Sequence, residues 1–377
     1  MAIKAGVRAI PLLDLTRQYQ PLREPMQAAL ARVIEAQRFI LGPEVERFEQ
    51  RFAAYCGARH AIGCASGTDA LELALMAADI GPGDEVLTVP FTFFATAGAI
   101  MSTGARPVFV DVEPDSFNLD VRQLEHAFAT HPAIKAILPV HLYGGCADMG
   151  PILECALARG IPVIEDAAQA VGAEWRGQRA GSIGTVGCFS FFPTKNLGGF
   201  GDGGMLTTND EDLARKLKAL RIHGSFEKYV HQWAGMNSRL DALQAAVLDV
   251  KLDHLDAWNR TRQRNAALYR EALEGIVTLP VQQLHQTSHV YNQFVIRCTR
   301  RDELRAFLSE SGVGTEVYYP LPLHLQPALA AYGYKAGDFP VSEQLSKEVL
   351  ALPIFAELTA EEIATVAGLI REFYGRA

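Results

Sequence analysis

FSFFPTKNLGGFGDGG, residues 189–204, places a single lysine, Lys195, between a β-like apolar run and a cluster of glycines. A lysine held in partly apolar surroundings loses hydration, which disfavours the ammonium form and lowers the pKa of the side chain. The neutral amine is a nucleophile that forms a Schiff base with an aldehyde. The alternative is a lysine that extends to solvent beside a glycine-rich turn, and this stretch alone does not separate the two interpretations.

Composition excludes several classes of protein. The chain has 377 residues, 49% of them hydrophobic and 21% charged, which is typical of a soluble chain with two or three domains. The net charge is -8 with no block of like charge, which argues against a nucleic-acid-binding surface. No apolar run reaches the ~18 residues that a membrane helix requires, so no membrane partner is expected.

The N-terminal residues and the spacing of the cysteines and histidines bear on the cellular compartment and on whether the protein binds a metal. Residues 1–16 lack the long apolar core of a secretion signal, and the six cysteines form no CxxC pair and lie mostly in apolar runs. We therefore expect buried thiols in a cytoplasmic protein. The ten histidines are scattered without ligand spacing, so no metal site is predicted.

Alternation of short apolar runs with helical stretches predicts the architecture. Two helical segments come first, at 19–37 and from Pro43 to Gly57. Repeated β–α alternation is typical of a largely parallel sheet with helices on both faces, and ligands bind such sheets at the carboxyl ends of the strands. The seven strand-like runs are 60–65, 85–90, 107–112, 134–141, 161–165, 186–192 and 205–208, and the helical stretches among them are 69–79, 92–101, 121–130 and 151–158.

The pattern changes after residue 222, where loop-like segments lead into a helix at 243–255 and a long polar helix at 256–272. We predict a domain boundary near residue 250, with a large domain at 1–250, including the N-terminal helical segment, and a small α+β domain at 251–377. The small domain is expected to hold strands at 291–298 and 314–319 and helices at 302–311, 342–350 and 359–373.

Three strand ends carry polar residues suited to a ligand. The Ser66-x-x-Asp69 pattern is either an N-capping box or part of a helix N-terminus that binds phosphate. Asp166 ends an apolar strand, where a carboxylate either meets a cation, such as a protonated pyridine nitrogen, or caps the next helix. Ser190 lies five residues before Lys195, and Asp166 lies 29 residues before it, which leaves room for one connection and one strand.

Eight motifs in order make the chain resemble, over nearly its whole length, the DegT/DnrJ/EryC1/StrS group of sugar aminotransferases that use pyridoxal phosphate. The resemblance implies the aspartate-aminotransferase fold, an α/β architecture with a large, mostly parallel seven-stranded α/β/α domain and a small α+β C-terminal domain. The motifs are LGPEVERFE (41–49), ASGTDAL (65–71), PFTFFATAGAI (90–100), HLYGGCADM (141–149), VIEDAAQA (163–170), the opening stretch (189–204), GMNSRLDALQAA (235–246) and YYPLPLHLQPA (318–328).

The resemblance also implies roles for individual residues. Lys195 forms the Schiff base and then acts as general acid/base, and Asp166 keeps the ring nitrogen protonated. Asn237 reaches the phosphate of the neighbouring subunit in a homodimer with shared sites. The other cofactor-binding residues are Gly67, Thr68 and Ser190 at the phosphate, Gln169 at the ring hydroxyl and Phe93 on the ring face. The substrate-binding residues are Arg239, Tyr318, Tyr319 and His324.

The implied reaction moves an amino group from an amino acid, expected to be L-glutamate, to a keto sugar on a nucleotide in a ping-pong cycle. Members with histidine in place of the lysine are dehydratases, so Lys195 favours amino transfer. The closest subgroup acts at C3 of UDP-2-acetamido-3-keto hexuronic acids, for polysaccharide biosynthesis. Enzymes for dTDP-3-keto-6-deoxyhexoses or 4-keto sugars are the alternative.

Two features leave the exact substrate open. Those subgroups commonly read His-Tyr-Pro, near the sugar, where this chain reads YYP at 318–320. Arg239 is implied to meet a substrate carboxylate, and the alternative is a structural pair with Asp241.

Two other classes of protein compete with a sugar aminotransferase. A regulator that binds pyridoxal phosphate without turnover is one, although no winged-helix or basic DNA-binding segment supports it. A cysteine desulfurase is the other, but it needs a reactive cysteine on a mobile loop, where none of these cysteines is expected.

Overall fold

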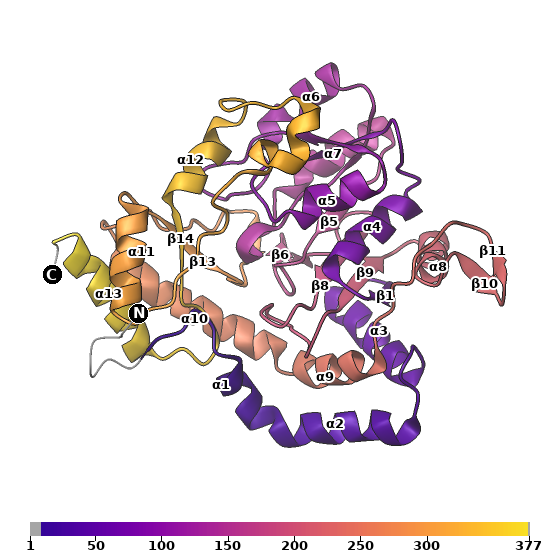
Figure 1. The fold of residues 1–377 in the computed structure, drawn as a ribbon, viewed down its shortest axis with the longest axis horizontal. Coiled ribbons are helices and arrows are strands. Elements are labelled where there is room, and N and C mark those ends of the chain that lie inside the picture. The colour runs from indigo at the N-terminus through magenta and orange to yellow at the C-terminus, as the bar shows by residue number, and fades with distance from the viewer. Residues whose placement is uncertain (1–8, 376–377) are drawn as a thin grey trace.

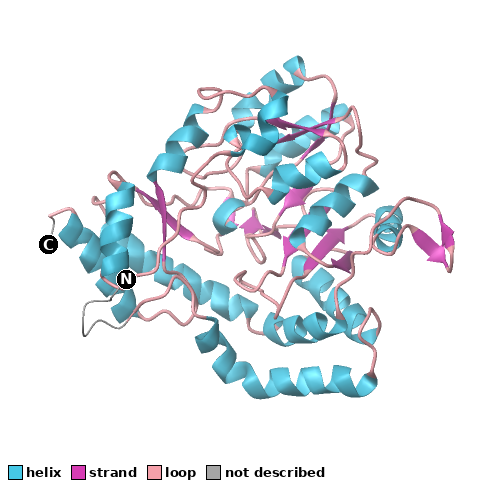
Figure 2. Cartoon of the chain, viewed as in Figure 1, coloured by secondary structure: helices cyan, strands magenta, loops and turns pink. Residues whose placement is uncertain are grey.

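Residues 9–375 are described by the structure, a computed structural model of the chain (Figure 1). Part of the N-terminal stretch that was expected to lack a secretion signal, residues 1–8, lies outside the described residues. The larger part of the molecule is built around a central sheet with helices on both sides, and a smaller part lies at the other end of a long helix (Figure 2).

The central sheet consists of a four-stranded and a three-stranded group. Parallel bridges at Ile137–Val163 and Val140–Asp166 join the two groups between β4 and β5. Within the sheet, β9 runs antiparallel to both of its neighbours, β1 and β8, so the prediction of a mostly parallel sheet is confirmed. In spatial order the strands are β3 (Arg106–Phe109), β2 (Glu85–Thr88), β4 (Ile134–Ile137), β5 (Ile164–Asp166), β8 (Val186–Ser190), β9 (Gly204–Thr208) and β1 (His60–Cys64).

Successive residues of each strand bury their side chains on opposite faces of the sheet, as the pleat requires. Cys188 and Leu206 belong to the apolar cluster on one face, whereas Phe189 and Met205 belong to the cluster on the other. Both faces are therefore covered by helices, as predicted. The first face packs against α4 (Gly67–Ala77), α5 (Ala95–Ser102) and α8 (Glu211–Leu220), and the second against α3 (Pro43–Cys56), α6 (Leu124–Thr130), α7 (Met149–Arg159) and α9 (Ala242–Leu252).

The first predicted helix, 19–37, is divided in the structure. Pro21 lies in the 3₁₀ turn η1 (Gln20–Leu22), which separates α1 (Leu15–Tyr19) from α2 (Arg23–Ala36). Proline has no N–H for an α-helical hydrogen bond, which explains the interruption. Helix α2 then packs along α9 (Figure 1).

The C-terminal part begins with α10 (Leu255–Leu273), which follows α9 after a turn at Asp253 and His254. This turn lies close to residue 250, and the division into domains at 1–250 and 251–377 stays a prediction. Helix α10 packs against α13 (Ala360–Phe373), which also contacts α11 (Arg301–Glu310), and the antiparallel strands β13 (Phe294–Arg297) and β14 (Val349–Leu352) lie beside them.

In the C-terminal part, one predicted helix is confirmed except at its end, and one predicted strand was wrong. The helix expected at 342–350 is α12 (Pro340–Glu348), and residues 349 and 350 belong instead to the buried strand β14. The strand expected at 314–319 was wrong, because these residues make a single bridge, between Glu316 and Ala351. Asp111, just after β3, begins α12 by accepting hydrogen bonds from the backbone N–H groups of Val341 and Ser342.

Several short elements were not predicted, because two- or three-residue strands leave little periodicity in a sequence. One of them, the hairpin of β10 (Ser225–Glu227) and β11 (Val230–His231), extends away from the rest of the molecule (Figure 1). The others are β6 (Glu174–Trp175), β7 (Gln178–Arg179), β12 (Gln286–Ser288), η3 (Leu142–Gly144), η4 (Leu323–Leu325) and η5 (Pro327–Tyr332), whereas η2 (Val121–Gln123) and α6 together form the helical stretch predicted at 121–130.

Two further expectations concern the cysteines and membrane-spanning helices. All six cysteines are free and buried, which confirms the prediction of buried thiols. None of the helices formed by residues 9–375 combines the length and the apolar character of a bilayer span.

A buried ion pair connects three elements of the large part. Glu49 of α3 is 7% exposed and accepts hydrogen bonds from the backbone N–H of Gly63 in β1, at 2.7 Å, and from Arg221 at the end of α8. Arg221 is 8% exposed and also donates to the carbonyl of Gly63, at 2.7 Å.

Replacing Glu49 with alanine leaves the guanidinium of Arg221 buried without its counter-ion. We expect Glu49→Ala to lower the free energy of unfolding, measured by urea titration, by about 3–5 kcal/mol. The exposed pair of Arg300 and Glu303 provides the control, since Glu303→Ala should leave the urea midpoint nearly unchanged. Equal midpoints for Glu49→Ala and Glu303→Ala would contradict the proposed contribution of the buried pair.

Candidate active site

The candidate residues gather where β5 and β8 end. These strands are parallel neighbours with Asp166 opposite Cys188, so Asp166 and Ser190 lie at the same edge of the sheet. The backbone N–H of Lys195 donates to the carbonyl of Phe192 at 2.9 Å, which turns the chain sharply after β8. The edge expected to bind a ligand therefore carries Asp166, Ser190 and Lys195 together.

Asp166 is 6% exposed and is surrounded mainly by neutral donors. Its Oδ2 accepts from the Thr96 hydroxyl at 2.8 Å, and its Oδ1 accepts from the backbone N–H of Ala168 at 3.2 Å. Burial raises the pKa of the Asp166 carboxyl, while these hydrogen bonds and the nearby Lys195 and His141 oppose the rise. Turns and bends, not a helix, follow Asp166, so the carboxylate is not a helix cap.

The side-chain amine of Lys195 has the lowered pKa that the sequence suggested. Burial lowers the pKa of Lys195 to about 8, and the negative charge of Asp166 partly opposes this change. The two side chains are therefore close enough to act on each other's ionisation. Among the interactions of residues 9–375, the Lys195 ammonium makes no hydrogen bond or ion pair, so its amine is free to react.

The start of α4 offers a place for a phosphate group. Ser66 accepts from the N–H of Asp69 at 3.1 Å and donates to its carboxylate at 2.6 Å, so the N-capping interpretation of this pair is confirmed. The N–H groups of Gly67 and Thr68 donate to no acceptor in the described part of the protein. A Cβ on Gly67 would lie 2.6 Å from the Cβ of Ser190, so only glycine leaves space between α4 and Ser190.

A hydrogen-bonded group of side chains forms the opposite wall of the site. The Gln169 amide donates to the Tyr319 hydroxyl at 3.1 Å and accepts from the backbone N–H of Tyr143 at 2.7 Å. The Tyr143 hydroxyl donates to the carbonyl of Tyr318. The ring of Phe93, which is 59% exposed, lies 6.2 Å from that of Tyr319. Four of the predicted residues thus meet from separate parts of the chain.

Asn237 and Arg239 are exposed or half-buried and make no recorded contact with the other candidates among residues 9–375. Ser238 between them accepts from the N–H of Ala65 at 3.0 Å, which attaches this segment to the turn before α4. Within the same residues Arg239 forms no ion pair, so the alternative structural pair with Asp241 is not formed.

His324 lies apart from the other candidates. It is 2% exposed, its Nε2 is 3.0 Å from Glu343, and its ring packs 4.8 Å from that of Phe339. The neighbouring residue, Leu323, donates its backbone N–H to the carbonyl of Pro90. His324 therefore belongs to the segment that supports the loop with Tyr318 and Tyr319.

Sequence reasoning missed several residues around Asp166. The hydroxyl of Thr96 orients the carboxylate of Asp166. The hydroxyl of Thr92, four residues earlier in the chain, lies 3.1 Å from that of Thr96. His141 is fully buried and donates from Nε2 to Glu165 at 2.9 Å, because its Nδ1 accepts from a backbone N–H. Thr92, Thr96, His141 and Glu165 all lie inside the motifs that carry the family resemblance. The motif positions without an assigned role were therefore the signal that could have identified these residues.

The comparisons with known proteins agree with this geometry. The model of the DegT/DnrJ/EryC1/StrS aminotransferase family matches residues 21–371. The chain is 51% identical to a pleiotropic regulatory protein of Geobacillus stearothermophilus, over 97% of this chain and 98% of that protein. It is 46% identical to a dTDP-3-amino-3,4,6-trideoxy-alpha-D-glucose transaminase of Streptomyces venezuelae, over 100% and 99% of the two chains.

Solved structures extend the similarity to the fold. The X-ray crystal structure of S. venezuelae DesV in complex with a ketimine intermediate has a TM-score of 0.95 at 46% identity, over 98% of this chain and 99% of that one. A family match over most of the chain, relatives similar along their full length and a shared fold lead to one conclusion. The chain belongs to the DegT/DnrJ/EryC1/StrS aminotransferase family.

Proposed function

We propose that the protein transfers an amino group from L-glutamate to the C3 keto group of a UDP-linked 2-acetamido-3-keto hexuronic acid. Members of its family are aminotransferases, and the cofactor is pyridoxal phosphate. The observation that carries the proposal is the unbonded amine of Lys195 beside the buried carboxylate of Asp166, at the carboxyl edge of the sheet.

The residues at this edge suit pyridoxal phosphate. The raised pKa of Asp166 indicates a carboxylate that lacks a full counter-charge, and a protonated ring nitrogen would supply it. The space kept open by Gly67, with the free N–H groups of α4 and the Ser190 hydroxyl, suits the phosphate. When bound, the cofactor supplies an aldehyde for covalent attachment and a ring that accepts electrons.

Each side chain then has a definite task in the proposed reaction. Nζ of Lys195 would be the point at which the cofactor attaches, and as a free amine it would accept and return a proton. Asp166, oriented by the Thr96 hydroxyl, would face the ring nitrogen of the cofactor and favour its protonated form. Gln169 and Tyr319 form the side wall, and Phe93 covers the ring face and excludes water.

Names of relatives support a nucleotide sugar as the acceptor. A relative of Pseudomonas aeruginosa, 42% identical over 96% of this chain, is named UDP-2-acetamido-2-deoxy-3-oxo-D-glucuronate aminotransferase. The Streptomyces relative acts on a dTDP sugar, as its name states, so a dTDP-3-keto-6-deoxyhexose or a 4-keto sugar is the alternative. The unpaired guanidinium of Arg239 favours the acidic sugar, because it suits a carboxylate at C6.

A regulatory role without turnover is the second candidate, and the name of the Geobacillus relative favours it. L-Glutamate added alone to the protein loaded with pyridoxal phosphate separates the two functions. An aminotransferase loses the visible absorbance of the cofactor and releases 2-oxoglutarate, whereas a regulator without turnover does neither.

The proposed setting is a cytoplasmic homodimer that serves polysaccharide biosynthesis. Large aromatic side chains around the site support a second subunit that covers them: Phe93, Phe192 and Phe200 are 59%, 49% and 48% exposed. In this dimer Asn237 would complete the phosphate site of its partner.

The first prediction concerns Lys195. Its pKa of about 8, against an ordinary 10.5, makes the neutral amine abundant once the pH exceeds about 8. The rate at which pyridoxal phosphate attaches to the cofactor-free protein should therefore rise with pH to a midpoint near 8. After borohydride reduction, peptide mapping should find the label on Lys195. A label on another lysine, or a midpoint near 10.5, would contradict the assignment.

The second prediction concerns Asp166. Asp166→Asn should keep the fold, checked by circular dichroism, and lower kcat by about a hundredfold or more, because the charge that holds the ring nitrogen protonated is lost. Thr96→Val removes only the orienting hydroxyl and should lower kcat less. Near wild-type turnover by Asp166→Asn would exclude the role at the ring nitrogen.

The third prediction concerns the shared site. Mixing Lys195→Ala with Asn237→Ala subunits should restore activity, because one site of the heterodimer then carries both changes and the other carries neither. Subunit exchange is verified with two affinity tags. Failure of exchanged heterodimers to recover activity would argue for sites complete within one chain.

The fourth prediction concerns the sugar. A UDP-sugar product with a carboxylate at C6 should bind more tightly than the matched alcohol by about 1.5–3 kcal/mol, the worth of hydrogen bonds to a charged group. Arg239→Lys should remove much of this preference in calorimetric titrations, because a single ammonium cannot reproduce the two-pronged contact. Tighter binding of a dTDP-6-deoxy sugar would favour the alternative substrate.

A further inference from the structure

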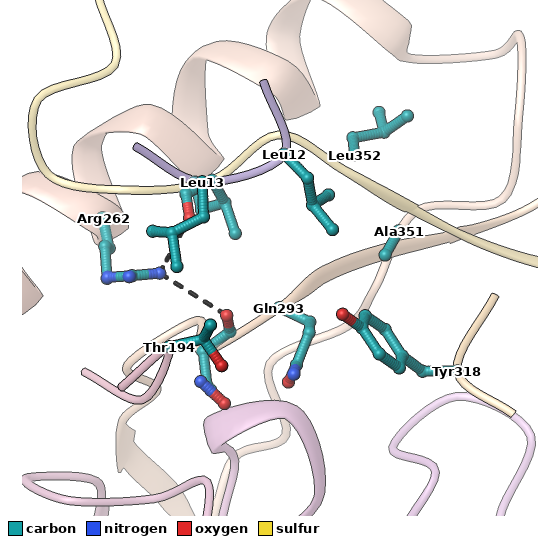
Figure 3. Close-up of a pocket in the computed structure, with 10 residues that line it drawn as sticks. Leu12, Leu13, Thr194, Arg262, Gln293, Tyr318, Ala351 and Leu352 are labelled. Atoms are coloured by element: carbon teal, nitrogen blue, oxygen red, sulfur yellow. Dashed lines mark hydrogen bonds between the residues drawn. The ribbon is translucent and has the colours of Figure 1, made fainter. Parts of the chain in front are cut away.

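A cavity lies between the segment that carries Lys195 and the C-terminal part of the chain (Figure 3). Its volume is about 80 Å3. Thr194 in its wall directly precedes Lys195, and Tyr318 directly precedes Tyr319, whose hydroxyl bonds to Gln169. The cavity and the candidate active site therefore share two segments of wall.

Polar side chains without partners surround this cavity. Within residues 9–375, the side chains of Thr194, Asn292 and Gln293 and the hydroxyl of Tyr318 make no hydrogen bond to protein. Asn292 is only 7% exposed, and its Oδ1 and the Oε1 of Gln293 are buried without a partner. Figure 3 shows Thr194, Gln293 and Tyr318 arranged around the same space. Buried polar groups are normally satisfied, so the two buried oxygens of Asn292 and Gln293 indicate a ligand, with the more exposed hydroxyls of Thr194 and Tyr318 beside them.

A buried positive charge lies in the same wall. Arg262 is 4% exposed, and its Nη1 donates to the carbonyls of Tyr291, at 3.0 Å, and Ile354, at 2.9 Å. No carboxylate of the described residues lies within 4.0 Å of its guanidinium, and Glu357 acts on it only from farther away. Burial lowers the pKa of Arg262 to about 10. Buried charges are ordinarily paired, so an anionic group in the cavity would complete the surroundings of Arg262.

We infer that this cavity binds the side-chain carboxylate of a dicarboxylic amino donor. The hydroxyls of Thr194 and Tyr318 and the amide groups of Asn292 and Gln293 can all donate to a carboxylate, since the two ends of each amide are interchangeable here. Arg262 contributes its charge, because its Nη1 hydrogens already bond to carbonyls.

This inference rests on the proposed function, in which L-glutamate is the amino donor. The cavity then selects L-glutamate over amino acids with neutral or shorter side chains, because a neutral side chain leaves the charge of Arg262 without a counter-ion. The substrate class assigned to the cavity is thus a dicarboxylic amino acid and its keto-acid product.

The test uses glutarate, which has both carboxylates of the donor but no amino group, so that binding is measured without reaction. Calorimetry on the protein loaded with pyridoxal phosphate should give tighter binding of glutarate than of butyrate. Gln293→Leu should weaken glutarate binding by about tenfold or more, the effect of one hydrogen bond to a charged group. Gln344→Leu makes the same change at an exposed position of α12 and should leave the affinity unchanged.

Thr194→Val deletes one hydroxyl with little change in shape, and it keeps the test decisive if Gln293→Leu folds poorly. It should raise the KM for L-glutamate and leave that for L-alanine unchanged. Equal affinity for glutarate and butyrate, or variants that affect both amino acids equally, would overturn the inference. The variants could weaken glutarate binding in a protein whose cofactor keeps its visible absorbance when L-glutamate is added. That result would support the role of the cavity and contradict the proposed function.

Discussion

The carboxylate of Asp166 and the amine of Lys195 lie together at one edge of the sheet, and this pair is the constraint on which the rest of the structure depends. Burial alone makes both charges costly, since it raises the pKa of Asp166 and lowers that of Lys195, and each charge relieves the other. The parallel pairing of β5 with β8 makes them neighbours. Neutral donors, the Thr96 hydroxyl and the Ala168 N–H, complete the surroundings of the carboxylate without neutralising it.

The glycine-rich segment after Lys195 is held by α9. Gln244 accepts from the N–H of Phe200 at 2.7 Å, and Lys251, two turns later, donates to the carbonyl of Gly198 at 2.6 Å. A Cβ on Gly198 would lie 2.3 Å from the backbone carbonyl oxygen of Pro193, so the sharp turn of this segment requires glycine there. The same helix follows the segment with Asn237 and Arg239, so its placement couples the lysine to both residues.

The sequence predicted the parts of the site whose chemistry is local. Lys195 among apolar neighbours and Asp166 at a strand end stood out from residue type and position, and the eight motifs of the resemblance chose between their alternative interpretations. Contacts between distant segments were not, such as the hydrogen bond of Thr96 to Asp166 across 70 residues. His324 follows the tyrosine loop in sequence but turns to Glu343, and the run 349–352 is apolar enough to suit either a helix or a strand. Tertiary packing, which no local pattern records, decides such cases.

The capping of α12 by Asp111 has a mechanical consequence. Hydrogen bonds fasten residues of the C-terminal part to the central sheet and its loops: Val341 and Ser342 to Asp111, Tyr334 to the carbonyl of Pro107, Leu323 to that of Pro90, and Arg106 to the carbonyl of Tyr332. A swing of the C-terminal part about the turn between α9 and α10 would have to break these bonds together. The bonds therefore oppose an opening of the C-terminal part by rotation about that turn.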